Sequence, residues 1–100
     1  MNQISKVSDV TYQDVAEYLR LDEVTQSDVG TLQTLIAVAK SYMCKYTGKA
    51  EQELDGSADF VIVLLVLCQD MWDTRALYVD SSNVNKVVES ILGLHQVNLL

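Results

Sequence analysis

The longest apolar stretch of the chain runs without interruption from Phe60 to Cys68, and it is the feature that most restricts the fold. From Gln69 to Tyr78 polar residues return, and the large apolar side chains recur every three or four positions. This combination is typical of a helix that is buried all round at one end and half-buried at the other. A buried parallel strand could also carry the β-branched residues of the run, but strands usually stop after about six residues. We therefore predict one central helix over residues 58–78.

Two further helices are predicted ahead of this segment. Thr11 can cap a short helix that ends near Arg20. A longer helix follows, capped by Thr25 or Ser27 and running to about Tyr46. Its apolar positions alternate by three and four residues: Val29, Leu32, Ile36, Ala39, Met43 and Tyr46.

The second half of the chain completes the bundle. Residues 49–57 are acidic, and we expect a linker of the length usual between packed helices. Residues 79–83 break the helical pattern and can cap a fourth helix, which Gly93 weakens at its end. The apolar side of that helix comprises Val84, Val87, Val88, Ile91 and Leu92. The prediction is an all-α fold, a small bundle of about four helices with a long buried central helix.

The 100 residues suffice for one domain with a small core of its own. Residues 1–10 are polar and aperiodic, so we expect a flexible arm there, followed by a helical domain over residues 11–95. A carboxy-terminal tail over residues 96–100 ends on Leu99 and Leu100, which a monomer of this size has little reason to expose. We expect this tail to dock onto another subunit or protein.

Fourteen acidic residues oppose seven basic ones, and the resulting net charge of -7 works against binding nucleic acids through their phosphates. The longest apolar run is about half of what a bilayer crossing needs, and the amino terminus has no secretory pattern. We expect a soluble intracellular protein. Cys44 and Cys68 lack the close spacing of metal or redox pairs, so we expect both to be buried, reduced and inert.

The chain offers little for catalysis. His95, the only histidine, lies near the carboxy terminus, where a carboxylate that orients it would be hard to place. Asp70 and Asp73 are neighbours on a helix surface, but a metal site would need a second such pair or a histidine at helical spacing. We interpret them as solvated, or as paired with Arg75 or a neighbouring subunit. We predict no enzymatic activity, no cofactor and no bound metal.

One enzyme-linked alternative stays open. Small acidic four-helix proteins include carrier domains that bear a prosthetic arm on a serine at a helix start. Asp80-Ser81 resembles this feature, although Val79 and Ser82 replace the usual glycine before it and leucine after it. A pantetheine adduct in an intact-mass spectrum would support this alternative.

Three stretches, taken in order, resemble the head-tail connector, or adaptor, proteins of long-tailed bacteriophages and prophages. They are DVAEYLRLD at 14–22, the segment 32–48 with its closing Tyr46-Thr47-Gly48, and DMWDTR at 70–75. The resemblance covers residues 10 to 95, and its specificity comes from the order and spacing of the stretches. In the last stretch, relatives often have a tyrosine, then an acid or asparagine, and then arginine.

The resemblance implies a helical subunit that assembles into a ring below the portal, continues the DNA channel and receives the tail or a stopper protein. Such a subunit is made in the bacterial cytoplasm and acts at the head-tail junction of the virion. Two features of the residues agree with this role. A surplus of apolar helix face is covered when copies associate, and head-to-tail contacts that close produce a ring. A channel lined with negative charge lets DNA pass without sequence-specific binding.

Interfaces in such an assembly are predicted at Arg20, Asp22, Asp73, Arg75, Leu99 and Leu100. The four charged residues can equally hold one subunit together, since a charged pair at a joint serves either purpose. A different class of function also stays open. In it, the chain is a small acidic helical regulatory or inhibitor module that covers a basic site on another protein.

Overall fold

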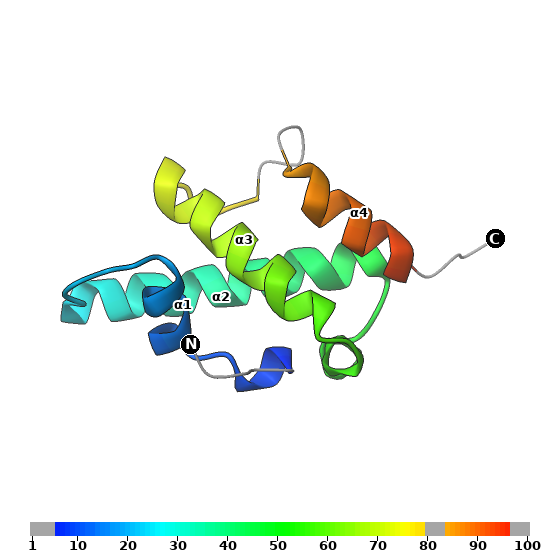
Figure 1. Ribbon diagram of the computed structural model, residues 1–100, viewed down its shortest axis with the longest axis horizontal. Helices are drawn as coiled ribbons and strands as arrows, with labels where there is room; N and C mark the ends of the chain where they lie inside the picture. The colour runs from blue at the N-terminus through cyan, green and yellow to red at the C-terminus, as the bar shows by residue number, and fades with distance from the viewer. Residues whose placement is uncertain (1–5, 80–83, 97–100) are drawn as a thin grey trace.

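The computed structural model describes residues 6–79 and 84–96, and over these residues the chain forms four α-helices and two short 3₁₀ helices, with no strand (Figure 1). The prediction of an all-α bundle of about four helices is confirmed. Helix α3 crosses the long helix α2, and α4 packs against both of them. The predictions for Asp80-Ser81, Leu99 and Leu100 concern residues outside the described part of the chain.

Helices α1 (Tyr12–Tyr18) and α2 (Gln26–Thr47) begin as the sequence predicts. The backbone N–H of Thr11 donates to Asp14 Oδ2 at 2.8 Å. At the start of α2, the N–H of Asp28 donates to Thr25 Oγ1 at 3.1 Å, and the N–H of Thr25 donates to Asp28 Oδ2 at 3.1 Å. Each carboxylate lies in the first turn, where the helix dipole favours negative charge. The buried apolar stripe of α2 comprises Leu32, Leu35, Ile36, Ala39 and Met43.

Helix α3 (Asp59–Thr74) is the predicted central helix, and its buried side chains make up much of the core: Phe60, Val61, Val63, Leu64, Leu65, Leu67, Cys68 and Met71. It ends four residues earlier than the predicted Tyr78. Arg75 adopts a left-handed backbone conformation with φ of 57°, and the N–H of Ala76 turns back to the carbonyl of Met71 at 3.1 Å. The apolar periodicity continues past this point, but the backbone has already left the helix.

Two segments that the sequence assigned to an arm and a linker pack into the core. A 3₁₀ helix, η1 (Val7–Asp9), lies against a second one, η2 (Glu51–Gly56). Val7 is 1% exposed and Leu54 is fully buried. The prediction of a flexible arm is therefore corrected from Val7 onward, and the linker is a folded element. The reason is that an isolated apolar residue leaves no periodic signal, although it can fill a gap between helices.

Helix α4 (Lys86–His95) has Asn85 as its cap, and Asn85 Oδ1 accepts from the N–H of Val87 at 2.8 Å. The predicted cap within residues 79–83 is replaced by this later one. Val88 and Leu92 are fully buried against the rest of the bundle. Gly93 lies within the last turn of the helix.

Candidate interaction site at the end of helix α3

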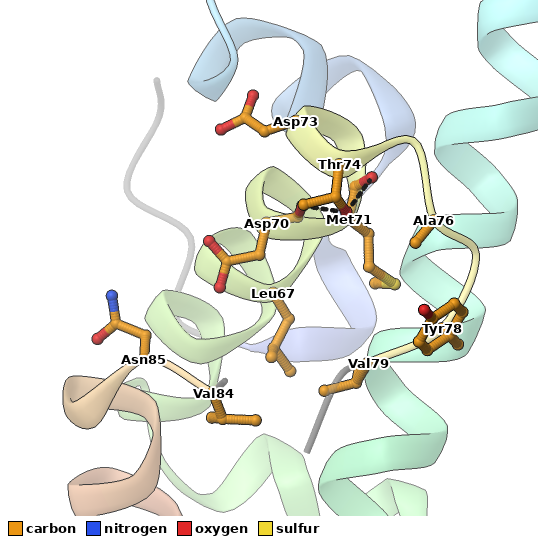
Figure 2. Close-up of a pocket in the computed structure, with 10 residues that line it drawn as sticks. All are labelled: Leu67, Asp70, Met71, Asp73, Thr74, Ala76, Tyr78, Val79, Val84 and Asn85. Atoms are coloured by element: carbon orange, nitrogen blue, oxygen red, sulfur yellow. Dashed lines mark hydrogen bonds between the residues drawn. The ribbon is translucent and has the colours of Figure 1, made fainter. Parts of the chain in front are cut away.

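A pocket of about 540 Å³ lies between the carboxy-terminal half of α3, the segment that follows it, and the start of α4 (Figure 2). The break in the helix at Arg75 creates one of its walls, because the chain turns away from the axis of α3 there. The described residues that line the pocket are Leu67, Asp70, Met71, Asp73, Thr74, Ala76, Tyr78, Val79, Val84 and Asn85. We call this feature the α3-end pocket.

The α3-end pocket combines an apolar interior with an acidic side. Figure 2 shows Leu67, Val79 and Val84 close together below Met71. The carboxylates of Asp70 and Asp73 lie on one side of α3, away from these groups. This arrangement suits a guest with an apolar stem and a positively charged end.

The electrostatics of the pocket also favour a cation. Burial raises the pKa of the Asp70 carboxyl above its ordinary value, and the nearby negative charge of Asp73 raises this pKa further. Neither Asp70 nor Asp73 has a basic partner within the described part of the chain. Two neighbouring carboxylates without a counter-charge repel each other, so a cation bound between them would be stabilised.

Arg75 does not pair with these carboxylates, which corrects one of the interpretations given above. Its Cζ atom lies 4.3 Å from the centroid of the Trp72 ring, as in a cation–π contact. At an exposed position such a contact is worth about 0.5–1 kcal/mol. Arg75 is therefore held over an aromatic face, beside the acidic side of the pocket.

The segment after Arg75 exposes two large apolar side chains. Leu77 is 58% exposed and Tyr78 is 65% exposed. They follow directly after Arg75, whose exposed guanidinium lies over the half-buried Trp72 ring. Tryptophan, tyrosine and arginine are the residues most enriched in the energetically important centres of protein interfaces. The end of α3 therefore has the composition of a protein-binding surface.

The two other described interface candidates lie at a different place, in the joint between α1 and α2. Arg20 follows α1 in a left-handed conformation with φ of 59°, and its N–H donates to the carbonyl of Glu17 at 3.1 Å. Both Arg20 and Asp22 are exposed. Among residues 6–79 and 84–96, no hydrogen bond or ion pair joins Arg20 or Asp22 to Asp73 or Arg75. Asp73 thus lines the α3-end pocket and Arg75 lies on Trp72, whereas Arg20 and Asp22 belong to the joint between α1 and α2.

His95 has a carboxylate beside it, which corrects the expectation that one would be hard to place. It packs against the start of α3, where its ring centroid is 4.6 Å from that of Phe60. Its Nε2 atom is 3.5 Å from Asp59 Oδ2, so the pair joins segments 36 residues apart. These contacts hold the end of α4 against the beginning of α3. The α3-end pocket lies at the other end of α3. This pairing could not be predicted from the sequence, because only the antiparallel packing of α4 on α3 creates it.

Both cysteines carry free thiols. Cys68 is fully buried, and burial raises the pKa of its thiol to about 12. Cys44 is only half-buried, which corrects the expectation for this residue. Burial, followed by the charges of Glu51 and Glu53, raises the pKa of its thiol as well. Neither thiol ionises near neutral pH, so both lack the thiolate that nucleophilic chemistry requires.

The described residues hold no group of three histidine, cysteine or acidic side chains placed to bind a metal ion. Within residues 6–79 and 84–96, no helix combines the length and the apolar character needed to cross a membrane. Comparisons with protein-family models, with curated proteins and with solved structures gave no match. The α3-end pocket and its exposed aromatic and charged neighbours are the candidate site.

Proposed function

We propose that this chain is the subunit of a homo-oligomeric ring that joins head to tail in a long-tailed bacteriophage or prophage. In this role the ring lies below the portal protein, receives the tail or a stopper protein, and continues the DNA channel. The proposal rests on the resemblance of residues 14–22, 32–48 and 70–75 to connector proteins, and the all-α fold agrees with it.

The single structural observation that supports assembly is the end of α3. There, Arg75, Leu77 and Tyr78 are exposed beside a pocket with an uncompensated acidic side. A compact domain gains little from such an arrangement in isolation, whereas an interface buries the apolar groups and neutralises the charges. The second described cluster of interface candidates, at Arg20 and Asp22, lies elsewhere on the subunit. Two different surfaces that bind each other give head-to-tail contacts, and these close into rings.

The net charge of -7 supports the channel part of the proposal. A ring of such subunits presents repeated negative charge to the DNA phosphates, so the duplex is repelled from the wall and passes without being gripped. This role needs no base-specific contact and no catalytic group.

The experiment is to purify the full chain and to measure its assembly by sedimentation velocity and electron microscopy, alone and with portal-bearing capsids. We expect rings in one or both conditions. If the chain stays monomeric at high concentration and also fails to associate with portal-bearing capsids, the proposal is wrong. Capture of one basic host protein in place of capsid and tail components would favour the regulatory or inhibitor module.

A further inference from the structure

We propose that Arg20 of a neighbouring copy of this chain binds in the α3-end pocket, and that this contact repeats head to tail around the ring. This inference rests on the proposed function, and it identifies which two surfaces of the subunit meet. Among the described residues, no basic side chain pairs with the carboxylates of the pocket, so a cation from another subunit can bind there.

The joint between α1 and α2 presents side chains that complement the α3-end pocket. Arg20 stands at a sharp left-handed turn, which directs the chain away from the axis of α1. Tyr18 and Val24, on either side of it in sequence, are among the large apolar residues that remain exposed, at 36% and 37%. The joint thus presents a cation with apolar neighbours, and the pocket presents apolar walls with two carboxylates.

Arginine is the better candidate among the basic residues of the chain. Lys40 is already paired with Glu51 at 3.4 Å, and Arg75 is held on Trp72. The planar guanidinium can donate to both carboxylates of an acidic pair, whereas a lysine ammonium acts as a point charge. Its stem of methylene groups can also lie along the apolar walls of the pocket. Arg20 has no ion-pair partner among the described residues of its own subunit.

The order of charges on the two surfaces is reciprocal. The joint carries a positive charge at Arg20, followed by negative charges at Asp22 and Glu23. The end of α3 carries negative charges at Asp70 and Asp73, followed by a positive charge at Arg75. When Arg20 enters the pocket, Asp22 is therefore brought toward the side on which Arg75 stands. Reciprocal charge order fixes the register of an interface and disfavours wrong pairings.

The inference is tested by charge reversal in the full chain, with self-association measured by sedimentation velocity. We expect Arg20→Glu and Asp73→Lys each to weaken self-association at least about 30-fold, because each leaves like charges facing each other. Combining both changes in one chain reverses the pair and restores most of the affinity. Lys45→Glu, which changes the net charge as Arg20→Glu does but lies on the exposed surface of α2, serves as the matched control and leaves assembly intact.

A second measurement tests whether Arg20 of one copy binds the pocket of another; growth of the unaltered chain beyond a dimer separates a head-to-tail contact from a symmetric one, which stops at a dimer. In a mixture of Arg20→Ala and Asp73→Ala chains, only the intact pocket of the first can bind the intact Arg20 of the second. A head-to-tail contact then gives dimers that do not grow, whereas either variant alone stays monomeric. Circular dichroism of each variant confirms that it is folded before assembly is compared.

The possible failures are distinguishable. If the unaltered chain assembles and both reversals leave its assembly unchanged, the binding of Arg20 in the pocket is disproved while the ring proposal stands. If reversals at Arg20 and Asp73 weaken assembly but their combination does not restore it, the two residues belong to separate contacts. The binding of Arg20 in the pocket is then disproved as well. If the unaltered chain never self-associates, either alone or on portal-bearing capsids, the inference fails together with the proposed function.

Discussion

Ser8 holds the carboxylate of Asp55 with two hydrogen bonds across 47 residues of sequence: its backbone N–H donates to Oδ1 at 2.9 Å and its hydroxyl donates to Oδ2 at 2.8 Å. This contact joins η1 to η2. It places Val7 and Leu54, which are both buried, at the same edge of the core. The amino-terminal segment is therefore anchored at a defined point.

We expect Asp55→Asn to lower the midpoint of thermal unfolding at neutral pH. The hydrogen bonds from Ser8 lower the pKa of the Asp55 carboxyl below its ordinary value of 3.8. A depressed pKa in the folded state means that the carboxylate contributes stability above pH 3.8, and that this contribution is lost as the pH falls through the folded-state value. The difference between the two proteins should shrink in acid. Thermal unfolding followed by circular dichroism across this pH range is the measurement, and a difference that does not depend on pH would contradict the assignment.

Two neighbours within the long apolar run should respond very differently to truncation. Leu64 is fully buried in the core, whereas Ile62 is 52% exposed. We expect Leu64→Ala to reduce the free energy of unfolding by about 2–5 kcal/mol, because it removes buried methyl groups and leaves a cavity. Ile62→Ala should cost less than about 1 kcal/mol. Urea unfolding at one fixed protein concentration measures both, and equal losses would show that the buried face of α3 is assigned incorrectly.

Arg75, the left-handed residue that ends α3, can be tested with two substitutions of which one is the control for the other. Both Arg75→Gly and Arg75→Ala remove the guanidinium from the Trp72 ring. Only glycine adopts a φ near 57° without steric cost, so the glycine variant should be more stable than the alanine variant by about 1 kcal/mol. The free energy of urea unfolding decides between them. An alanine variant as stable as the glycine variant would mean that α3 does not end in this conformation.

The two thiols should differ in their accessibility to reagents. We expect a thiol-reactive aromatic disulfide to modify Cys44 slowly in the folded protein at pH 8, and to leave Cys68 untouched until the chain unfolds. Cys68 is protected by full burial and by a pKa of about 12. Absorbance of the released aromatic thiol, with and without denaturant, follows both reactions. Cys44→Ala is the control, and rapid modification of the folded control would contradict the burial of Cys68.

Much of the fold was predictable because helices leave repeated signals. The stripe of α2 recurs over many turns, and the Thr25–Asp28 pair marks its start by a local spacing. Each of these signals depends on residues within one or two helical turns. The apolar run of α3 was equally plain. It could not show that Leu64 is buried and Ile62 exposed, since both belong to the same continuous apolar sequence.

The candidate site was predictable only in part. Asp73 and Arg75 were singled out from the sequence, and the structure places them at the rim of the pocket and on the adjacent Trp72. The pocket itself was missed, since Val84 and Asn85 complete it from the segment that precedes α4. The left-handed conformation of Arg75 could not be predicted either, because glycine usually occupies the left-handed position at the end of a helix.

The sequence by itself determined that this chain is helical, where α1 and α2 begin, and which apolar run supplies the centre of the core. The tertiary structure decided that α3 stops at Thr74, that Val7 and Leu54 are buried, and that His95 returns to the start of α3. The physical reason is the range of the interactions. Helix periodicity and capping act between near neighbours in the chain, whereas a pocket, a buried single residue or a cross-helix contact exists only once distant segments have packed together.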